Sequence, residues 1–355
     1  MITSIRTALV GAFAACGLLL AAGGASAQAI TEYALPSPGA LGRGITEGPD
    51  GALWFVGGGN RVIRATTAGS ITEYAIPTPA SEPYGITTGP DGALWFSESG
   101  ADKIGRITTA GVITEFPLPP GTGPEQVVTG PDGALWFTAI NANAIGRMTT
   151  AGSVTLYPLP NPNSGVFWMT VGPDGALWFT EQTGNRIGRI TTAGTITEFA
   201  VPTAGSGVYD ITAGPDGALW FTEAAGNKIG RITTSGVFTE FAVPTMGAAP
   251  LGIAAGPDGA LWFTEYFGNR IGRITPAGVV TEYPLPNPNS QPAFITRGPD
   301  DAMWFPEFGG NRIGRISVPV VAAPVPTLSE WAMIVFGLGL AGGAAVYVQR
   351  RRWLA

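Results

Sequence analysis

One eight-residue motif recurs seven times in this chain of 355 residues and constrains its fold more than any other feature. The motif reads GPDGALWF, or GPDDAMWF in the last copy, and its copies begin at Gly48, Gly89, Gly130, Gly172, Gly214, Gly256 and Gly298. Successive copies are 41 or 42 residues apart. So regular a period indicates one supersecondary unit repeated in tandem.

Each repeat contains four short runs of β-branched and aromatic residues, which we name strands a to d in chain order. In the second repeat these runs cover residues 84–88, 93–98, 103–108 and 112–118. Glycine and proline interrupt the chain about every ten residues, which excludes ordinary helices. Four strands a repeat and seven repeats predict an all-β, seven-bladed propeller of four-stranded blades.

The order of the motifs predicts how the ring closes. The strand-d motif, Ile-Thr-Glu-Tyr and its variants, also occurs seven times, but its first copy at Ile30 precedes the first GPDGALWF. The last repeat therefore lacks its own strand d. We expect residues 30–35 to pair with residues 312–317, which would close the ring and remove a free sheet edge. The seven motif tryptophans are predicted to pack between blades, because a large aromatic between apolar neighbours buries much area.

The N-terminal 27 residues have the pattern of a secretory signal peptide. Arg6 precedes an apolar run over residues 8–22, and Ala25-Ser26-Ala27 forms a cleavage site, so the propeller is predicted to cover residues 28–318. The only cysteine, Cys16, lies in the apolar run. Lipid attachment at Cys16 is an alternative, but apolar residues follow it. After cleavage at Ala27 the exported chain would have no cysteine, and therefore no disulfide and no cysteine metal site. The secretion machinery is the first predicted partner.

The C-terminal segment predicts a membrane helix. A Val/Ala/Pro linker over residues 319–326 ends in the proline of a Pro-Thr-Leu sequence. The segment 327–355 then contains the rest of this sequence, an apolar stretch over residues 332–348 and three arginines. Seventeen apolar residues span about 26 Å as a helix, and the arginines favour a cytoplasmic end. The segment resembles the IPTL-type sorting tails of Gram-negative bacteria, with Val325 where the signature has isoleucine. This resemblance implies an exosortase-like membrane protease as partner, at least transient inner-membrane anchoring, and a periplasmic or cell-surface propeller.

Composition disfavours a nucleic-acid partner. The net charge is −6, and four of the 19 basic residues lie in the two terminal segments, so the propeller itself is more acidic still. Binding to phosphates requires clustered Lys and Arg.

Two sets of residues on one face of the predicted propeller are candidate sites. The nearly invariant a–b and c–d turns share one face, and the variable b–c loops and d–a crossovers share the other, where binding is expected. Strand b ends there in five glutamates: Glu98, Glu181, Glu223, Glu265 and Glu307. If they converge on the central channel, they would suit Mg²⁺ or Ca²⁺; alternatively each is paired structurally with backbone or with an arginine such as Arg186.

Aromatic residues also gather on the variable face. The candidate ligand-binding residues are Tyr84, Phe167, Trp168, Tyr209 and Tyr266, with Phe267 and Phe308 nearby. They could stack on a sugar or another flat ligand, or they could simply fill space between loops.

The repeated unit P-x-G-I-x-x-G-P-D-G-A-L-W-F-T-E, followed by G-N-R-I-G-R-I-T and I-T-E-F, resembles the virginiamycin B lyase (streptogramin lyase) family over residues 30–317. The resemblance implies the seven-bladed propeller and a Mg²⁺-dependent elimination that opens cyclic streptogramins. It also implies a catalytic histidine fourteen residues before a strand-b glutamate, and a second histidine one blade earlier.

This chain contains no histidine. The corresponding positions hold Arg43, Tyr84, Glu125, Phe167, Tyr209, Leu251 and Ala293. Because histidine is the usual acid–base group near neutral pH, its absence argues against lyase activity, although Glu125 could act as a base and Tyr84 or Tyr209 as an acid. We expect a propeller that binds a small ligand, glycan or protein at its variable face without catalysis. A metal-dependent C–O lyase and a purely structural surface protein are the alternatives.

Overall fold

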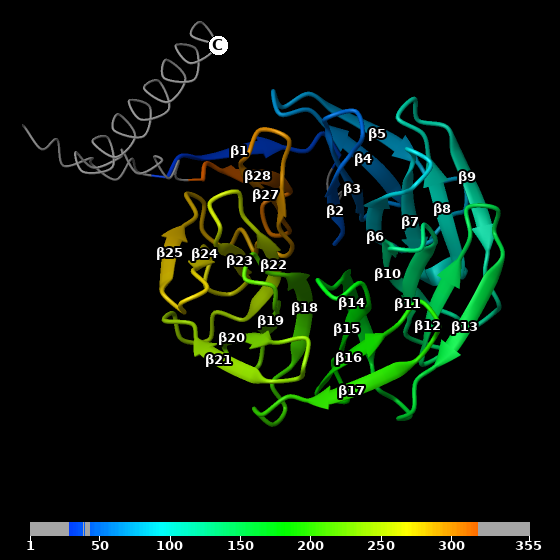
Figure 1. Ribbon diagram of the computed structural model, residues 1–355. Helices are drawn as coiled ribbons and strands as arrows, with labels where there is room; N and C mark the ends of the chain where they lie inside the picture. The colour runs from blue at the N-terminus through cyan, green and yellow to red at the C-terminus, as the bar shows by residue number, and fades with distance from the viewer. Residues whose placement is uncertain (1–27, 38, 40–42, 319–355) are drawn as a thin grey trace, which may run out of the picture.

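The computed structural model describes residues 28–37, 39 and 43–318, and these form the predicted seven-bladed propeller. Seven antiparallel sheets of four strands stand around a central channel (Figure 1). Blades 1 to 6 are meanders, because each strand pairs with its neighbour in the chain, and in blade 7 the outermost strand comes from the N-terminal end of the propeller. The first strand of each blade lines the channel, and the last lies on the outer rim.

The first four blades follow one another in chain order. Blade 1 contains β2 (Ile45–Glu47), β3 (Leu53–Gly57), β4 (Arg61–Ala65) and β5 (Ile71–Ala75). Blade 2 contains β6 (Pro83–Thr88), β7 (Leu94–Glu98), β8 (Lys103–Ile107) and β9 (Ile113–Pro117). Blade 3 contains β10 (Pro124–Thr129), β11 (Leu135–Ala139), β12 (Ala144–Met148) and β13 (Val154–Pro158). Blade 4 contains β14 (Val166–Val171), β15 (Leu177–Glu181), β16 (Arg186–Ile190) and β17 (Ile196–Ala200).

The last three blades complete the ring. Blade 5 contains β18 (Val208–Ala213), β19 (Leu219–Glu223), β20 (Lys228–Ile232) and β21 (Phe238–Ala242). Blade 6 contains β22 (Pro250–Ala255), β23 (Leu261–Glu265), β24 (Arg270–Ile274) and β25 (Val280–Pro284). Blade 7 contains β26 (Thr296–Arg297), β27 (Met303–Glu307), β28 (Arg312–Ile316) and β1 (Ile30–Ala34).

The ring closes as predicted. Strand β1 pairs antiparallel with β28, with Ile30 opposite Ile316 and Ala34 opposite Arg312. The Leu35 N–H extends the pairing by donating to the Asn311 carbonyl at 3.0 Å. The two ends of the propeller thus share one sheet, and β1 completes blade 7 as its outermost strand.

The helical content of the described residues is one short 3₁₀ turn, η1 (Ser99–Ala101). Within the same residues no helix is long and apolar enough to cross a membrane. The predicted signal peptide over residues 1–27, the linker over 319–326 and the apolar stretch over 332–348 lie outside the described residues.

The motif tryptophans form the core between blades, as predicted, and none of the seven has exposed surface. Trp54 of blade 1, for example, packs with Ile86, Leu94 and Phe96 of blade 2. An outer-strand aromatic of the same blade packs on each indole with ring centroids 5.2–5.8 Å apart, stacked in six blades and tilted by 30° in blade 2.

The aspartate of each GPDG turn anchors the tryptophan that follows it, a role the sequence alone did not suggest. In every blade the indole Nε1–H donates to the aspartate Oδ1 at 2.9–3.1 Å. An arginine of strand c donates from Nε to the aspartate Oδ2 at 2.6–2.7 Å. The aspartate thus fastens the a–b turn to strand c and satisfies the one polar atom of a buried indole.

We expect Asp174→Ala to lower the free energy of unfolding by roughly 2–3 kcal/mol, because it orphans the buried Trp178 Nε1–H and the Arg189 guanidinium together. Denaturation in urea measures the change. Asp174→Asn, which keeps an oxygen acceptor for the indole, should cost less than the alanine variant. Equal losses in the two variants would show that the hydrogen bond to the indole does not matter.

Candidate functional site

A bulge in the innermost strand shapes the channel mouth in blades 2 to 6. The ladder between strands a and b shifts register after the first residue of strand a, as between Pro83 and Ile86 in β6. The hydroxyl of strand b fills the gap: in blade 4, Thr180 Oγ1 accepts from the Trp168 N–H at 3.1 Å and donates to the Tyr209 carbonyl of blade 5 at 2.9 Å. Bulges re-aim side chains, and here they direct the residues at the start of strand a to the mouth.

The predicted aromatic residues meet in one cluster across this channel. Tyr84, Phe167 and Trp168 are buried there with Phe294, and Tyr209 and Tyr266 pack against them half-buried. Trp168 and Phe294, from opposite parts of the ring, stack with centroids 4.4 Å apart. Phe167 lies 4.7 Å from Tyr209. Most of the aromatic surface is therefore covered by other aromatic rings. The sequence analysis missed Phe294, which stands in the same register position as Trp168.

The five strand-b glutamates do not meet at the channel. Each glutamate lies fully buried in its own blade, and neither oxygen of its carboxyl group accepts a hydrogen bond. Burial raises the pKa of Glu98, Glu181, Glu223 and Glu307 to about 7 and that of Glu265 to about 8. The second cause in every case is a neighbouring glutamate on strand d of the same blade.

In blades 2 and 5 the strand-d glutamate is the ionised member of the pair. In blade 2 the Glu115 carboxylate accepts from the Thr78 N–H and hydroxyl at 2.9 and 2.7 Å and from Lys103 Nζ at 2.9 Å. Burial opposes ionisation, but these donors outweigh it and lower the pKa of Glu115. A protonated Glu98 carboxyl beside an ionised Glu115 carboxylate satisfies both groups. We call this set of strand-b glutamate, strand-c cation, strand-d glutamate and crossover donor the blade polar unit.

Blade 3 replaces the whole blade polar unit with apolar residues. Ala139 stands for the strand-b glutamate, Ala144 for the strand-c cation and Leu156 for the strand-d glutamate, and all three pack in one hydrophobic cluster. Pro119 stands where blade 2 has Thr78, and proline has no N–H to donate. Blade 1 keeps Arg61, Glu73 and the crossover donor Ser37 but has Gly57 at the strand-b position, so the strand-b glutamate occurs only where the other three groups are present. The repeat therefore indicates that the strand-b glutamate depends on these three groups and stabilises its blade together with them.

The metal implied by the resemblance does not fit this arrangement. Within the described part of the chain, no three side chains of the His, Cys, Asp and Glu types lie together so that they could hold an ion. Each strand-b glutamate instead faces one carboxylate and one Lys or Arg of its own blade. The strand-c arginines named as possible partners, such as Arg186, pair with the strand-d glutamate, here Glu198 at 4.0 Å.

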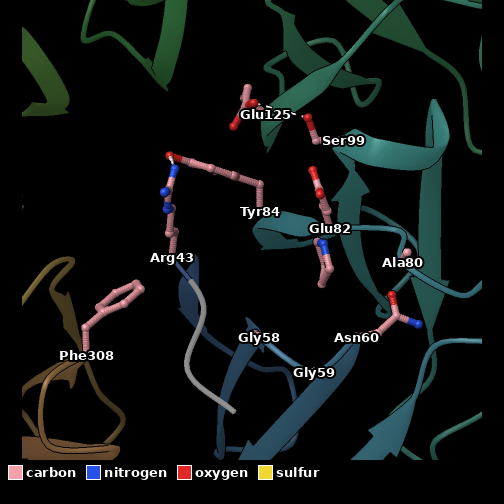
Figure 2. Close-up of a pocket in the computed structure, with 12 residues that line it drawn as sticks. Arg43, Gly58, Gly59, Asn60, Ala80, Glu82, Tyr84, Ser99, Glu125 and Phe308 are labelled. Atoms are coloured by element: carbon pink, nitrogen blue, oxygen red, sulfur yellow. Dashed lines mark hydrogen bonds between the residues drawn. The ribbon is translucent and has the colours of Figure 1, made fainter. Parts of the chain in front are cut away.

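A cavity of about 570 Å³ opens at the channel mouth over blades 1 and 2, and we call it the mouth cavity. Figure 2 shows Arg43 and Phe308 on one side of it and Glu82 and Asn60 on the other. It is lined by Arg43, Gly57, Gly58, Gly59, Asn60, Ala80, Glu82, Pro83, Tyr84, Ser99, Glu125 and Phe308. Three consecutive glycines at the end of strand b and the start of the b–c loop in blade 1, where blade 6 has Glu265-Tyr266-Phe267, leave this side of the mouth open.

Charged groups converge on the mouth cavity from three blades. The Arg43 guanidinium lies 4.5 Å from the Tyr84 ring centroid and donates to the Tyr84 hydroxyl. Ser99 Oγ donates to Glu125 Oε1 at 3.1 Å, whereas Glu125 Oε2 is buried and has no partner. Burial raises the pKa of Glu125 to about 7, opposed by the Ser99 bond and the Arg43 charge. Burial likewise raises the pKa of the Tyr84 phenol.

Of the residues predicted to bind a ligand, only Tyr84 lines the mouth cavity. Arg43 and Glu125 were identified in the sequence as residues at the histidine positions, and Glu82 was missed. A comparison of register positions would have found it, because the equivalent positions hold Gly123, Gly165, Gly207, Ala249 and Gln291.

Comparison with known proteins agrees with this fold. The model of the virginiamycin B lyase family matches residues 24–123 and 119–328, and the IPTL-CTERM motif matches residues 323–352. The motif indicates a protein that is exported and sorted at the cell envelope. A comparison with curated protein sequences found no significant match.

Three solved structures are similar over most of the chain. A streptogramin B lyase is 41% identical, with a TM-score of 0.79, covering 82% of this chain and 98% of that one. Virginiamycin B lyase from Staphylococcus aureus is 43% identical, with a TM-score of 0.78, covering 82% and 100%. A catalytically inactive histidine-to-alanine variant of that lyase, solved with quinupristin, gives the same values. The sequence repeat, the fold and the match to the family model agree, and this chain belongs to the virginiamycin B lyase family.

Proposed function

We propose that this chain is an exported, envelope-sorted propeller that binds a small polar molecule in the mouth cavity and does not open streptogramin antibiotics. The observation that carries the proposal is the mouth cavity itself. Its charged lining consists of Arg43, Glu82 and Glu125, and the other described residues at the same register positions are uncharged. The apolar departures of blade 3 pack against one another, whereas these charged side chains line an open cavity, which is where a ligand is expected.

The absence of catalysis rests on the missing proton-transfer group. Replacing one histidine with alanine inactivates the lyase from Staphylococcus aureus, and this chain has no histidine. Glu125, with a pKa of about 7, is the one residue at a histidine position suited to act as a base. Tyr84 is a poor acid, because burial raises the pKa of its phenol by more than the hydrogen bond and charge of Arg43 lower it.

The route to the envelope is part of the proposal. Residues 1–27 would direct export through the secretion machinery, and residues 327–355 would hold the protein in the inner membrane of a Gram-negative cell until an exosortase-like protease acts. The propeller would then face the periplasm or the cell exterior.

Two assays test the proposed function. The purified protein with Mg²⁺ should leave quinupristin intact by reverse-phase chromatography, while the lyase from Staphylococcus aureus consumes it as the positive control. In a thermal-shift panel of glucose, glucuronate, N-acetylglucosamine and the L-amino acids, at least one probe should raise the melting temperature of the wild type and not that of Arg43→Ala.

Each result is decisive. Consumption of quinupristin that Glu125→Gln abolishes would establish a lyase and overturn the non-catalytic assignment. A panel without any shift would overturn ligand binding at the mouth cavity and favour a structural surface protein.

A further inference from the structure

The mouth cavity carries charges of both signs on separate walls, and this determines the class of ligand it fits. Arg43 approaches from the side of Phe308, and Glu82 lies on the opposite side (Figure 2). In the described residues no carboxylate forms an ion pair with Arg43, and its guanidinium donates a hydrogen bond to the Tyr84 hydroxyl. A guanidinium has five N–H donors, so it retains donors for a carboxylate of a ligand.

The acidic wall needs hydrogen-bond donors. Glu125 is about nine-tenths buried, and its Oε2 has no partner in the structure. Glu82 is exposed to the cavity, and its side chain forms no ion pair among the described residues. An unsatisfied buried acceptor is costly, and an ammonium group, with three donors and a positive charge, satisfies it better than a neutral hydroxyl.

Glu82 also costs backbone strain. Its φ is 49°, in the left-handed region that Ala249 and Gln291 share at the equivalent positions, where Gly123, Gly165 and Gly207 stand in three other blades. A non-glycine residue there costs about 1 kcal/mol or more. A residue that is strained, charged and directed to a cavity indicates a role outside the stability of its own loop.

We propose that the mouth cavity binds a small zwitterion, such as an amino acid or a dipeptide. The ligand's carboxylate binds Arg43 and its ammonium binds Glu125 and Glu82. This inference rests on the proposed function and adds the chemical class of the ligand. The cavity, at about 570 Å³, has room for a molecule of this size. A doubly anionic ligand such as a phosphate is disfavoured, because the two glutamates outnumber the one arginine.

Matched probes separate the two charges of the ligand. Isothermal titration of the full protein with L-alanyl-L-alanine should give saturable binding. N-acetyl-L-alanyl-L-alanine, which lacks the ammonium, and L-alanyl-L-alaninamide, which lacks the carboxylate, should each bind at least tenfold more weakly. The free L-amino acids extend the series to smaller zwitterions.

Variants assign each charge to its wall. Arg43→Gln should weaken the dipeptide and the N-acetyl dipeptide but not the amide, whereas Glu125→Gln should weaken the dipeptide and the amide but not the N-acetyl dipeptide. Glu82→Gly should weaken the dipeptide while leaving the fold at least as stable, because it relieves the strained φ. Glu47→Gln, an exposed strand-a residue remote from the mouth cavity, is the matched control and should change nothing.

The outcomes distinguish this inference from the proposed function. If glucose or glucuronate binds in an Arg43-dependent way and the zwitterions do not, the ligand class is wrong and the binding function stands. If dipeptide binding survives both Arg43→Gln and Glu125→Gln, the proposed site is wrong. If no zwitterion binds, the inference is overturned.

Discussion

The free energy of unfolding of this propeller should fall as the pH rises from about 4.5 to about 7. The five strand-b glutamates have a folded-state pKa of about 7 or 8 against an ordinary value of 4.5. The folded state therefore binds more protons than the unfolded state across this window. By linkage, that stability is fully present below pH 4.5 and is lost as the pH passes through the folded pKa.

The size of the effect follows from the number of groups. If each contributes on the order of 1 kcal/mol, the melting temperature should be roughly 10 °C lower at pH 8 than at pH 5. The GPDG aspartates act in the opposite direction at lower pH. The bonds from tryptophan and arginine outweigh burial and lower the pKa of six of them, so their contribution is lost as the pH falls below 3.8. Stability should thus be greatest near pH 4 to 5.

A single variant isolates one glutamate from the rest. Glutamine resembles the protonated carboxyl, so Glu223→Gln should leave the free energy of unfolding nearly unchanged at pH 5 and raise it by roughly 1 kcal/mol at pH 8. Urea denaturation of the wild type and of Glu223→Gln at pH 5 and pH 8 measures these free energies of unfolding. A wild-type profile that is flat between pH 5 and pH 8 would show that the buried carboxyls do not hold their protons.

A glutamate placed in blade 3 should destabilise the protein unless its partners come with it. Ala139→Glu puts a carboxyl among the apolar groups of Ala144 and Leu156, and an unpartnered buried carboxyl should cost roughly 3 kcal/mol or more. The further changes Ala144→Lys, Leu156→Glu and Pro119→Thr rebuild the blade polar unit. The quadruple variant should recover at least half of the loss, measured by urea denaturation.

Matched variants make this test specific. Ala139→Gln has the volume of the glutamate without its charge, so its cost reports steric crowding alone. The cost of Ala139→Glu should also be smaller at pH 5 than at pH 8, because the carboxyl is then protonated. A quadruple variant no more stable than the sum of its separate changes would mean that the four positions do not act as a unit.

The sequence predicts the fold well because every repeat carries the same signals. The period gave the seven blades, the displaced motif at Ile30 gave the closure with β28, and the position of the tryptophans between apolar neighbours gave the core. These features depend on local patterns that repetition makes unambiguous.

The candidate site was less predictable because it depends on distances across the channel. The sequence places Tyr84 and Trp168 on the variable face. It does not show that Phe294, from the opposite part of the ring, stacks on Trp168 and covers it. The sequence places the strand-b glutamates at the ends of their strands. It does not show that a second glutamate, from strand d of the same blade, lies beside each of them. It does not reveal that three glycines of blade 1 open a cavity beside Arg43.

The measurement that tests the central claim most directly is an isothermal titration of the purified protein with Mg²⁺ at pH 7.5, beside a Glu223→Gln/Glu265→Gln variant. The central claim is that the repeated glutamates stabilise their blades and that function lies where the repeat is broken. It predicts no stoichiometric heat of binding and the same melting temperature with and without the ion. Stoichiometric Mg²⁺ binding that disappears in the double variant would contradict it.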